Sequence, residues 1–270
     1  MLKPNGSNLA LVRTPFGAIL LNDIRIGSVA SMEKVLLAWS GGKDSALALY
    51  ELWKENDYKV VALLTTLTAD YDRVSMHGVR RSLLERQAES LGILLEKVYI
   101  SKNASNEEYE RGMRGVLVKY RDRGVSSVVF GDIFLEDVRE YRENNISKVG
   151  MKGIFPLWKK DTTRLANEFI DLGFKAIITC TDSKFLDGRF VGRQYDRRFL
   201  SDLPPTVDPC GENGEFHTFA YEGPMFARPV PVCPGEVVER EGFLFRDLLP
   251  AGAVGAAEGD RRGPTSRKAS

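Results

Sequence analysis

The 270-residue sequence is poor in cysteine, in net charge and in long apolar runs. Its three cysteines, Cys180, Cys210 and Cys233, are widely spaced and form no C-x-x-C pair, which argues against a structural zinc site or a disulfide framework. This cysteine usage predicts a reducing, cytoplasmic setting. A formal net charge of +1 provides no general basic field, so nucleic acid is not an expected partner. No apolar run reaches the roughly 18 residues that a membrane-spanning helix needs, so we expect no membrane partner.

The most informative segment joins an apolar strand, a glycine-rich loop and a helix. Residues 35–39 are apolar, Ser40-Gly41-Gly42-Lys43-Asp44-Ser45 follows, and a helical pattern begins at once. Glycine lets the backbone bend and approach a ligand, and a helix start offers unpaired N–H groups and a positive dipole end. Two serine hydroxyls and the lysine ammonium add further donors. We therefore predict a binding site for the pyrophosphate of a nucleotide.

The spacing of this loop excludes two common nucleotide motifs. Only two glycines precede Lys43 and neither Ser nor Thr follows it, unlike the G-x-x-x-x-G-K-[ST] loop of the common NTPases. The loop also lacks the G-x-G-x-x-G spacing of dinucleotide-binding proteins. A simpler alternative is a glycine-rich turn that only caps a helix.

Strand and helix patterns alternate through the first half of the chain. Strands are predicted at 34–39, 60–67, 94–100 and 127–130, with helices between them. This order predicts an α/β fold with a Rossmann-like parallel sheet and helices on both faces. Ligands of such sheets bind beyond the carboxyl ends of the strands, where the loop at 40–45 and Gly131-Asp132 both lie.

The sequence predicts four segments. Residues 1–32 form an N-terminal extension of little order, 33–131 an ATP-binding domain, 132–248 a smaller C-terminal α+β substrate-binding subdomain, and 249–270 a disordered tail. Beyond Thr181, glycine, proline and charged residues interrupt the pattern, so we expect loops and short elements there.

Four strings carry a resemblance to a known family. The loop at 40–45 resembles the pyrophosphate loop (PP-loop) of the ATP pyrophosphatase, or adenine nucleotide alpha hydrolase, superfamily. Together with residues 156–158 (PLW), 161–165 (DTTRL) and 209–219 (PCGENGEFHTF), it resembles the diphthine–ammonia ligase family. The style of Val207-Asp208-Pro209-Cys210 is similar to the bacterial branch. This resemblance covers about 35–226.

The resemblance implies an ATP-dependent amidation, with ATP and Mg²⁺ as cofactors. A carboxylate is activated as an acyl adenylate, pyrophosphate leaves, and ammonia displaces AMP. In eukaryotes and archaea the carboxylate belongs to diphthine, a modified histidine of an elongation factor; bacteria do not make diphthamide, so the substrate here is an unidentified small molecule or modified protein side chain. The oligomeric state is open, with a homo-oligomer as one option.

The phosphate contacts are assigned to the loop at 40–45, where Lys43 neutralises charge on the leaving pyrophosphate. Asp44 either binds Mg²⁺ or caps the helix. Asp132, with Gly131 at a strand end, is either a second Mg²⁺ ligand or substrate contact, or a helix N-cap. The end of the second strand offers Thr65 and Thr66 for adenine or ribose, with loop polarity as the alternative.

Three further residues come from the family string. His217 either orients the carboxylate and works as an acid or base, or is a packed core residue. Glu215 is assigned to incoming ammonium and Glu212 to substrate or metal, and the two roles are not separable from sequence. His77 follows the second strand, where the superfamily places adenine or substrate contacts.

Two other functions compete with the ligase. One is a PP-loop tRNA-modifying enzyme such as a thiolase, which the absence of paired cysteines and of basic charge disfavours. The other is a nucleotide-binding sensor without turnover, in which the acidic string at 211–219 is structural.

Overall fold

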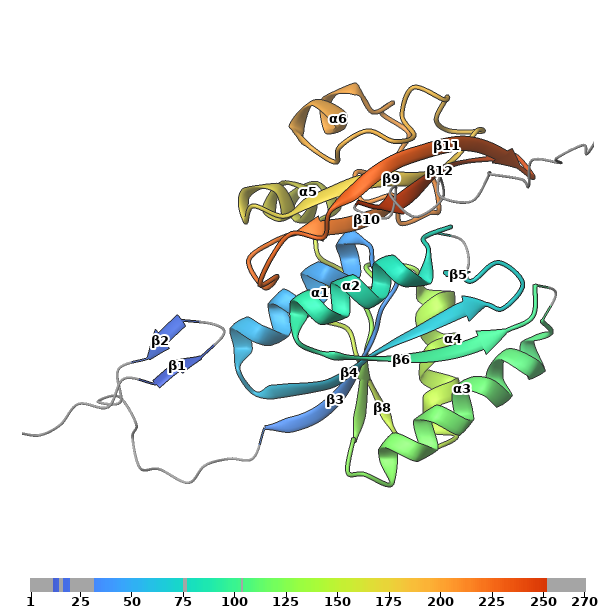
Figure 1. Ribbon diagram of the computed structural model, residues 1–270. Coiled ribbons are helices and arrows are strands. Elements are labelled where there is room, and N and C mark those ends of the chain that lie inside the picture. Colours follow the sequence, from blue (N-terminus) through green and yellow to red (C-terminus); the bar gives the residue numbers. More distant parts are fainter. Residues whose placement is uncertain (1–11, 15–16, 20–31, 75–76, 103, 252–270) are drawn as a thin grey trace, which may run out of the picture.

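The computed structural model describes residues 12–14, 17–19, 32–74, 77–102 and 104–251, and its larger sheet is built from parallel strands (Figure 1). In this sheet β3 lies between β4 and β7, β4 also pairs with β6, and β7 pairs with β8. Their bounds are β3 (Glu33–Ala38), β4 (Tyr58–Thr68), β6 (Leu94–Ile100), β7 (Ser127–Val129) and β8 (Lys152–Ile154). A short antiparallel strand, β5 (Arg73–Val74), pairs with the end of β4.

Helices cover both faces of this sheet, as the sequence predicts. Within β3, Val35 and Leu37 belong to one buried cluster and Leu36 to another, because alternate side chains point to opposite faces. The first cluster includes residues of α1 (Lys43–Glu55) and α2 (Arg81–Leu91), and the second packs against α3 (Asn106–Arg121) and α4 (Glu136–Ser147). The Rossmann-like α/β prediction is therefore confirmed.

A second, antiparallel sheet lies over α1 and α2 (Figure 1). Its spatial order is β10 (Phe216–Glu222), β9 (Lys175–Asp182), β12 (Phe243–Pro250) and β11 (Val232–Arg240), and it is accompanied by α5 (Thr162–Asp171) and α6 (Arg197–Asp202). An α+β C-terminal part is thus confirmed. The expectation of loops and short elements beyond Thr181 is confirmed for residues 183–215, where α6 is the one helix, but was wrong for the strands β10, β11 and β12 that follow. β11 shows no apolar run because it is an edge strand with mostly exposed side chains.

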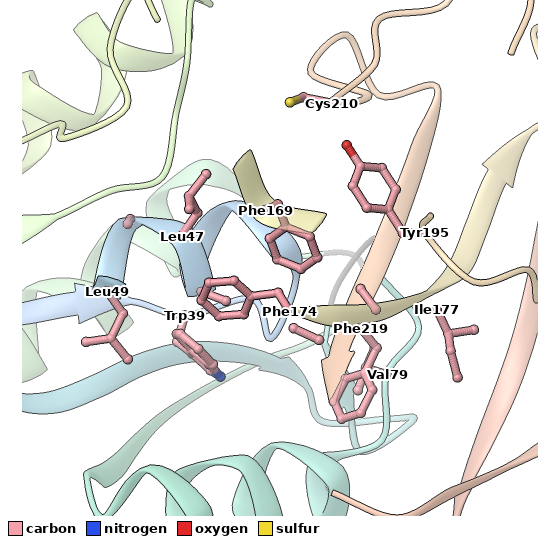
Figure 2. Packing of buried hydrophobic residues seen from close by; sticks show 14 of the residues in the cluster. Trp39, Leu47, Leu49, Val79, Phe169, Phe174, Ile177, Tyr195, Cys210 and Phe219 are labelled. Carbon is pink, nitrogen blue, oxygen red and sulfur yellow. The ribbon is translucent and has the colours of Figure 1, made fainter. Parts of the chain in front are cut away.

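One apolar core joins the two sheets through α1. Figure 2 shows Phe169 and Phe174 among the side chains packed in this region, and their rings stack at 4.8 Å. Phe174 also meets the Tyr50 ring of α1 edge-on at 6.0 Å. Burial of these rings between α1 and the C-terminal part stabilises the position of the second sheet over the first.

The described elements bear on the predicted segments. The predicted boundary after Gly131 precedes α4 and β8, although β8 pairs with β7 in the parallel sheet. Within the predicted N-terminal extension, β1 (Val12–Thr14) and β2 (Gly17–Ile19) form an antiparallel hairpin. Most of that extension, and the predicted tail from 252 onward, lie outside the described residues. In the described part of the chain, none of the helices is long and apolar enough to cross a membrane.

Candidate active site

The glycine-rich loop lies at the point where the strand order of the parallel sheet reverses. β3, which leads into the loop, has β4 on one side and β7 on the other. Gly131 and Asp132 follow β7, so the two predicted segments meet at neighbouring strand ends. Doubly wound sheets bind their ligands in the crevice at this position.

Three glycines make the loop compact. Gly41 has φ +79°, a left-handed conformation, and a Cβ there would lie 2.6 Å from Leu84 Cδ2. A Cβ on Gly131 would lie 3.0 Å from the carbonyl carbon and oxygen of Asp44, and one on Gly42 would lie 3.1 Å from the Thr218 oxygen. A larger residue at Gly41 is both strained and blocked, and the start of α1 is packed directly against the end of β7.

Gln87 of α2 fixes this loop, and the sequence analysis missed it. The side chain is 0% exposed, and its Nε2 donates to the carbonyl oxygens of Gly41 (2.9 Å) and Ala220 (2.5 Å). Its Oε1 accepts from Trp39 Nε1 at 2.9 Å. The side-chain amide of Gln87 thus uses all of its hydrogen-bonding capacity except one lone pair of Oε1. A polar residue on the apolar stripe that contains Leu84 and Ala88 is the signal that would have revealed it.

Strand β10 of the second sheet also holds the loop. Ala220 N donates to the Gly41 oxygen (2.9 Å), and Lys43 N donates to Thr218 Oγ1 (3.0 Å). On the other side, Ser45 Oγ donates to the Gly42 oxygen at 3.0 Å and lies 3.4 Å from Ser40 Oγ. The predicted phosphate loop is therefore held in place by contacts from both halves of the chain.

The ammonium of Lys43 turns inward and is nearly buried. It lies 2.8 Å from both Asp44 carboxylate oxygens and also donates to the Cys210 carbonyl. The rings of Tyr195 and Phe216 flank it at 5.8 and 5.5 Å. Burial alone lowers the pKa of Lys43, but the Asp44 carboxylate outweighs it and the net shift is upward, so the side chain is charged.

An acidic turn faces this lysine. Asp208 Oδ1 accepts from the backbone N–H groups of Cys210 (2.9 Å) and Glu212 (3.2 Å). Glu212 Oε1 in turn accepts from Ile133 N at 2.7 Å, which ties the turn to the segment after β7. Burial raises the pKa of Glu212 to about 7, and the Asp44 charge adds to the effect. The carboxyl group thus changes charge near neutral pH.

Glu215 and Cys210 are packed inside the same turn. Glu215 is 1% exposed, and its Oε1 accepts from Asp208 N and Asn213 Nδ2, both at 3.0 Å. Its buried Oε2 has no hydrogen-bond partner in the described part of the chain. Cys210 is 3% exposed and burial raises its pKa to about 12, so its thiol is protonated.

The structure brings His77 and His217 together. Their ring centroids are 4.4 Å apart with an interplanar angle of 34°. His77 comes from the segment between β5 and α2, and His217 from β10, so the pair bridges the two sheets. Burial lowers the pKa of His217 well below its usual value, and the neighbouring His77 and Lys43 lower it further. His217 is therefore a neutral imidazole, and its Nε2 is buried without a hydrogen-bond partner among the described residues.

Thr65 and Thr66 are neighbours in β4, so their side chains point to opposite faces of the sheet. Thr65 is 2% exposed, and Thr66 Oγ1 lies 3.9 Å from Met113 Sδ of α3. Asp132 is ion-paired with Arg142 of α4, with Oδ2 2.8 Å from the guanidinium Nε. Thr66 and Asp132 thus face the α3 and α4 side and do not meet the histidine pair.

The carboxylates do not assemble into a protein-only metal centre. Over the described ranges, no group of three or more His, Cys, Asp or Glu side chains is placed to hold a metal ion. Asp44 faces Lys43 and Asp132 faces Arg142. A magnesium ion bound mainly by nucleotide phosphates and water needs only one or two carboxylates.

The fold and the switch-point loop define an α/β protein with the architecture of the PP-loop ATP pyrophosphatases. The family profile "Diphthamide synthase N-terminal domain" matches residues 33–153, and "Diphthamide synthase C-terminal domain" matches 161–246. Together they cover most of the chain, which therefore belongs to the diphthamide synthase family.

Curated relatives agree with this family. A diphthine–ammonia ligase of Schizosaccharomyces pombe is 26% identical over 76% of this chain and 37% of its own length. The Danio rerio ligase is 24% identical over 76% and 89%, and the Homo sapiens ligase 30% over 48% and 50%. The chain thus spans little more than a third of the fission-yeast relative. Among solved structures, U34-tRNA thiolase NcsA from Methanococcus maripaludis matches 52% of this chain and 57% of its own, at 20% identity and TM-score 0.32.

Proposed function

We propose that this chain is an ATP-dependent, amide-forming ligase. The observation that carries the proposal is the loop at 40–45, which lies at the switch point and is held there by β10 of the second sheet through Thr218 and Ala220. Nucleotide chemistry at the loop and recognition by the second sheet would then share one crevice. The names of the curated relatives support the same reaction class.

The reaction has two steps. A substrate carboxylate oxygen attacks the α-phosphorus of ATP, the bond to the bridging oxygen breaks, and pyrophosphate leaves with that electron pair. Ammonia then attacks the acyl carbon, AMP leaves, and the nitrogen loses a proton to a base. The products are the amide, AMP and pyrophosphate.

The phosphate contacts belong to the loop. Backbone N–H groups and the hydroxyls of Ser40 and Ser45 would bind the phosphates, with Gly131 leaving room beside α1. Lys43 would stabilise the charge of the leaving pyrophosphate. For this, its ammonium has to contact the nucleotide phosphates as well as the Asp44 carboxylate. Thr65 and Thr66 in β4, and His77 in the segment between β5 and α2, remain candidates for adenosine contacts.

The second step needs a proton acceptor. His217 is neutral and has a buried, unpartnered Nε2, so it is our candidate for the base. Glu212, whose pKa is near 7, is the alternative acceptor. Glu215 holds the turn that positions Glu212, and Asp132 positions Arg142; we keep both as candidate contacts for ammonium and substrate.

The excess of acidic groups around Lys43 fits a divalent cation. Asp44, Asp208 and Glu212 place negative charge where the phosphates would bind, and Mg²⁺ would offset it. Both carboxylates face a cation, Asp44 facing Lys43 and Asp132 facing Arg142. The Asp44 side chain is the more exposed of the two, so it is the better candidate ligand. When bound, Mg²⁺ would neutralise phosphate charge.

Product analysis tests the proposal. The full chain is incubated with α-³²P-labelled ATP, Mg²⁺, ¹⁵N-ammonium and a metabolite extract, and we expect labelled AMP together with a ¹⁵N-labelled amide. Lys43→Met should abolish both products, while the matched control Lys54→Met, on the exposed side of the same helix, should retain them. ADP as the only nucleotide product would contradict the ligase.

Binding measurements alongside the product analysis test the two competing functions. Tight tRNA binding that weakens steeply with salt would support a tRNA-modifying enzyme. ATP binding without AMP release, over all candidate carboxylates and amines, would support a sensor.

A further inference from the structure

A cavity lies between the two sheets, and no residue of the phosphate loop lines it. Its volume is about 830 Å³, within the size range of small-molecule sites. Its walls come from the ends of β4 and β6, the segment before α2, and the β11–β12 pair. The apolar part of the lining is Tyr71, Val74, Ile100, Val238, Phe245 and Leu249.

The polar lining is predominantly cationic. Arg73 and Arg80 share Asp247, at 2.8 and 2.6 Å. The remaining cations, Lys102, Arg240 and Arg246, form no ion pair with any carboxylate in the described part of the chain. Glu236 is the other acidic lining residue. The cavity therefore has unbalanced positive charge.

Two of these cations flank an exposed aromatic ring. Lys102 Nζ and Arg240 Cζ each lie 5.4 Å from the centroid of Tyr71, which is 42% exposed. On the inner side, Arg246 Nη1 donates to the Gly235 oxygen, but its buried Nε has no hydrogen-bond partner among the described residues. That nitrogen packs against Gly192, where a Cβ would lie 2.6 Å from it, so only the rest of the Arg246 side chain is available to the cavity.

A short run of packed residues lies between the cavity and the candidate active site. Gly78 lines it with φ +67°, and a Cβ there would lie 2.9 Å from Phe245 Cδ1, so the backbone packs directly on that ring. The preceding residue is His77, which stacks on His217. The residue after His217 is Thr218, which accepts from Lys43 N.

We propose that this cavity binds the body of the carboxylate substrate, a free small molecule with an apolar or aromatic body and two or more carboxylates. This inference rests on the proposed ligase function. Lys102, Arg240 and Arg246 would hold the carboxylates that do not react, and Tyr71 and Phe245 the body. The reacting carboxylate would extend past His77 toward the phosphate loop.

A single-stranded RNA, which also uses aromatic rings between cations, fits less well. The chain has a net charge of only +1, and Lys102, Arg240 and Arg246 line a single cavity instead of a continuous track.

Calorimetry with naphthalene-2,6-dicarboxylate tests the inference, with naphthalene-2,6-dicarboxamide as the uncharged counterpart. We expect the dianion to bind the full chain. The affinity of the diamide should be at least about tenfold lower, because charge-assisted hydrogen bonds are lost. The double variant Lys102→Gln/Arg240→Gln should lose a similar factor for the dianion. Both side chains are exposed, so the fold should be retained. The control Arg189→Gln, 82% exposed and outside the cavity, should bind as the wild type does.

The binding outcome is independent of turnover. ATP affinity should be equal in all three proteins. If the dianion fails to bind at millimolar concentration, if the diamide binds equally well, or if the double variant keeps wild-type affinity, the inference is overturned even where AMP is formed. Displacement of the dianion by a labelled oligonucleotide would also overturn it, in favour of RNA. Conversely, specific dianion binding without any AMP release would leave the cavity assignment standing and remove the ligase.

Discussion

His77 and His217 stack with their ring centroids 4.4 Å apart, and they are the two histidines of the chain. His77 follows β5 of the parallel sheet and His217 lies in β10 of the second sheet, so the relative position of the sheets decides whether they meet. Burial is the largest cause that lowers the pKa of His217, and the neighbouring His77 lowers it further, so the His217 ring is neutral.

The first prediction concerns the charge of His217. Its imidazole should remain neutral at the pH where an ordinary histidine takes up a proton, because burial, His77 and Lys43 all lower its pKa. Imidazole ¹⁵N NMR measures this directly, and the variant His77→Gln leaves a single histidine to assign. In that variant the pKa of His217 should rise but stay below its usual value, since burial is the largest cause. A His217 signal that titrates near pH 6.5 in the wild type would disprove the prediction.

The second prediction concerns Gly41. Gly41→Ala should lower the free energy of unfolding by roughly 1–3 kcal/mol and weaken ATP binding, because the new Cβ would collide with Leu84 and Gln87. Gly92→Ala is the matched control, since Gly92 has φ +66° but nothing within 4 Å of the added Cβ. The control should show a strain of about 1 kcal/mol and unchanged ATP affinity. Urea denaturation and calorimetry measure the two effects, and equal behaviour of both variants would contradict the packing argument.

The third prediction concerns Gln87. Gln87→Leu removes the side-chain partner of the Ala220 oxygen and of the Trp39 N–H, and leaves the Gly41 oxygen with Ala220 N as its remaining donor. Buried groups left unsatisfied in this way should destabilise the protein by about 3 kcal/mol, which lowers Tm by roughly 6–12 °C. Thermal denaturation followed by circular dichroism measures the shift.

The control for this variant is Gln194→Leu. Gln194 is exposed and accepts one hydrogen bond, from Tyr221. Its loss should change stability by less than about 0.5 kcal/mol. If the two variants shift Tm equally, Gln87 is not the tie between the loop and β10.

The fourth prediction concerns Glu212 and pH. Its pKa is raised to about 7 in the folded state, from an ordinary value of 4.5, so the folded protein holds the proton more tightly. This contribution to stability is complete below the unfolded pKa and is lost as pH rises toward and through 7, by no more than about 3 kcal/mol. Glu212→Gln keeps an acceptor for Ile133 N but cannot ionise. Urea denaturation at pH 5 and pH 8 should therefore show a smaller fall in stability for the variant, and an identical fall would refute the assignment.

The fifth prediction concerns the Asp247 ion pairs. Arg80 and Arg73 lower the pKa of Asp247 to about 2, against the opposing effect of burial. Its contribution, about 2 kcal/mol, is present above pH 4 and is lost as pH falls toward 2. Asp247→Asn should be less stable than the wild type at pH 7, with a smaller difference at pH 3. The control Asp187→Asn, which removes an exposed pair with Arg189, should have no measurable effect.

The sequence predicted the parallel sheet because its signals are local. Buried strands such as β3 read as continuous apolar runs, and α1 and α2 have an apolar stripe with helical spacing. β11 gave no such signal, since most of its side chains are exposed and it is held by pairing with β12. Although β12 follows β11 directly in the sequence, this pairing rests on backbone hydrogen bonds, which amino-acid type scarcely reveals.

The site was predictable where geometry demands a particular residue type. Gly41 has to be glycine because of its φ, so a motif records it. Gln87 acts through its position on α2 beneath the loop, and a single polar residue in an apolar stripe does not disclose its partners. The inward turn of Lys43 depends on Asp44 and the Cys210 carbonyl, which come together only in the folded chain.

The bond from Ala220 to Gly41 has a consequence for the unit that folds. Two family profiles divide the chain between residues 153 and 161, yet one apolar core runs from α1 into β9 and β10. A fragment ending at residue 153 would expose the face of α1 that carries Leu49 and Tyr50, and its loop would lose the backbone partner that shapes it. The two family profiles describe two sequence modules. Because the modules share one core, we expect them to unfold together as one cooperative unit. A nucleotide bound at the loop would then stabilise the whole unit.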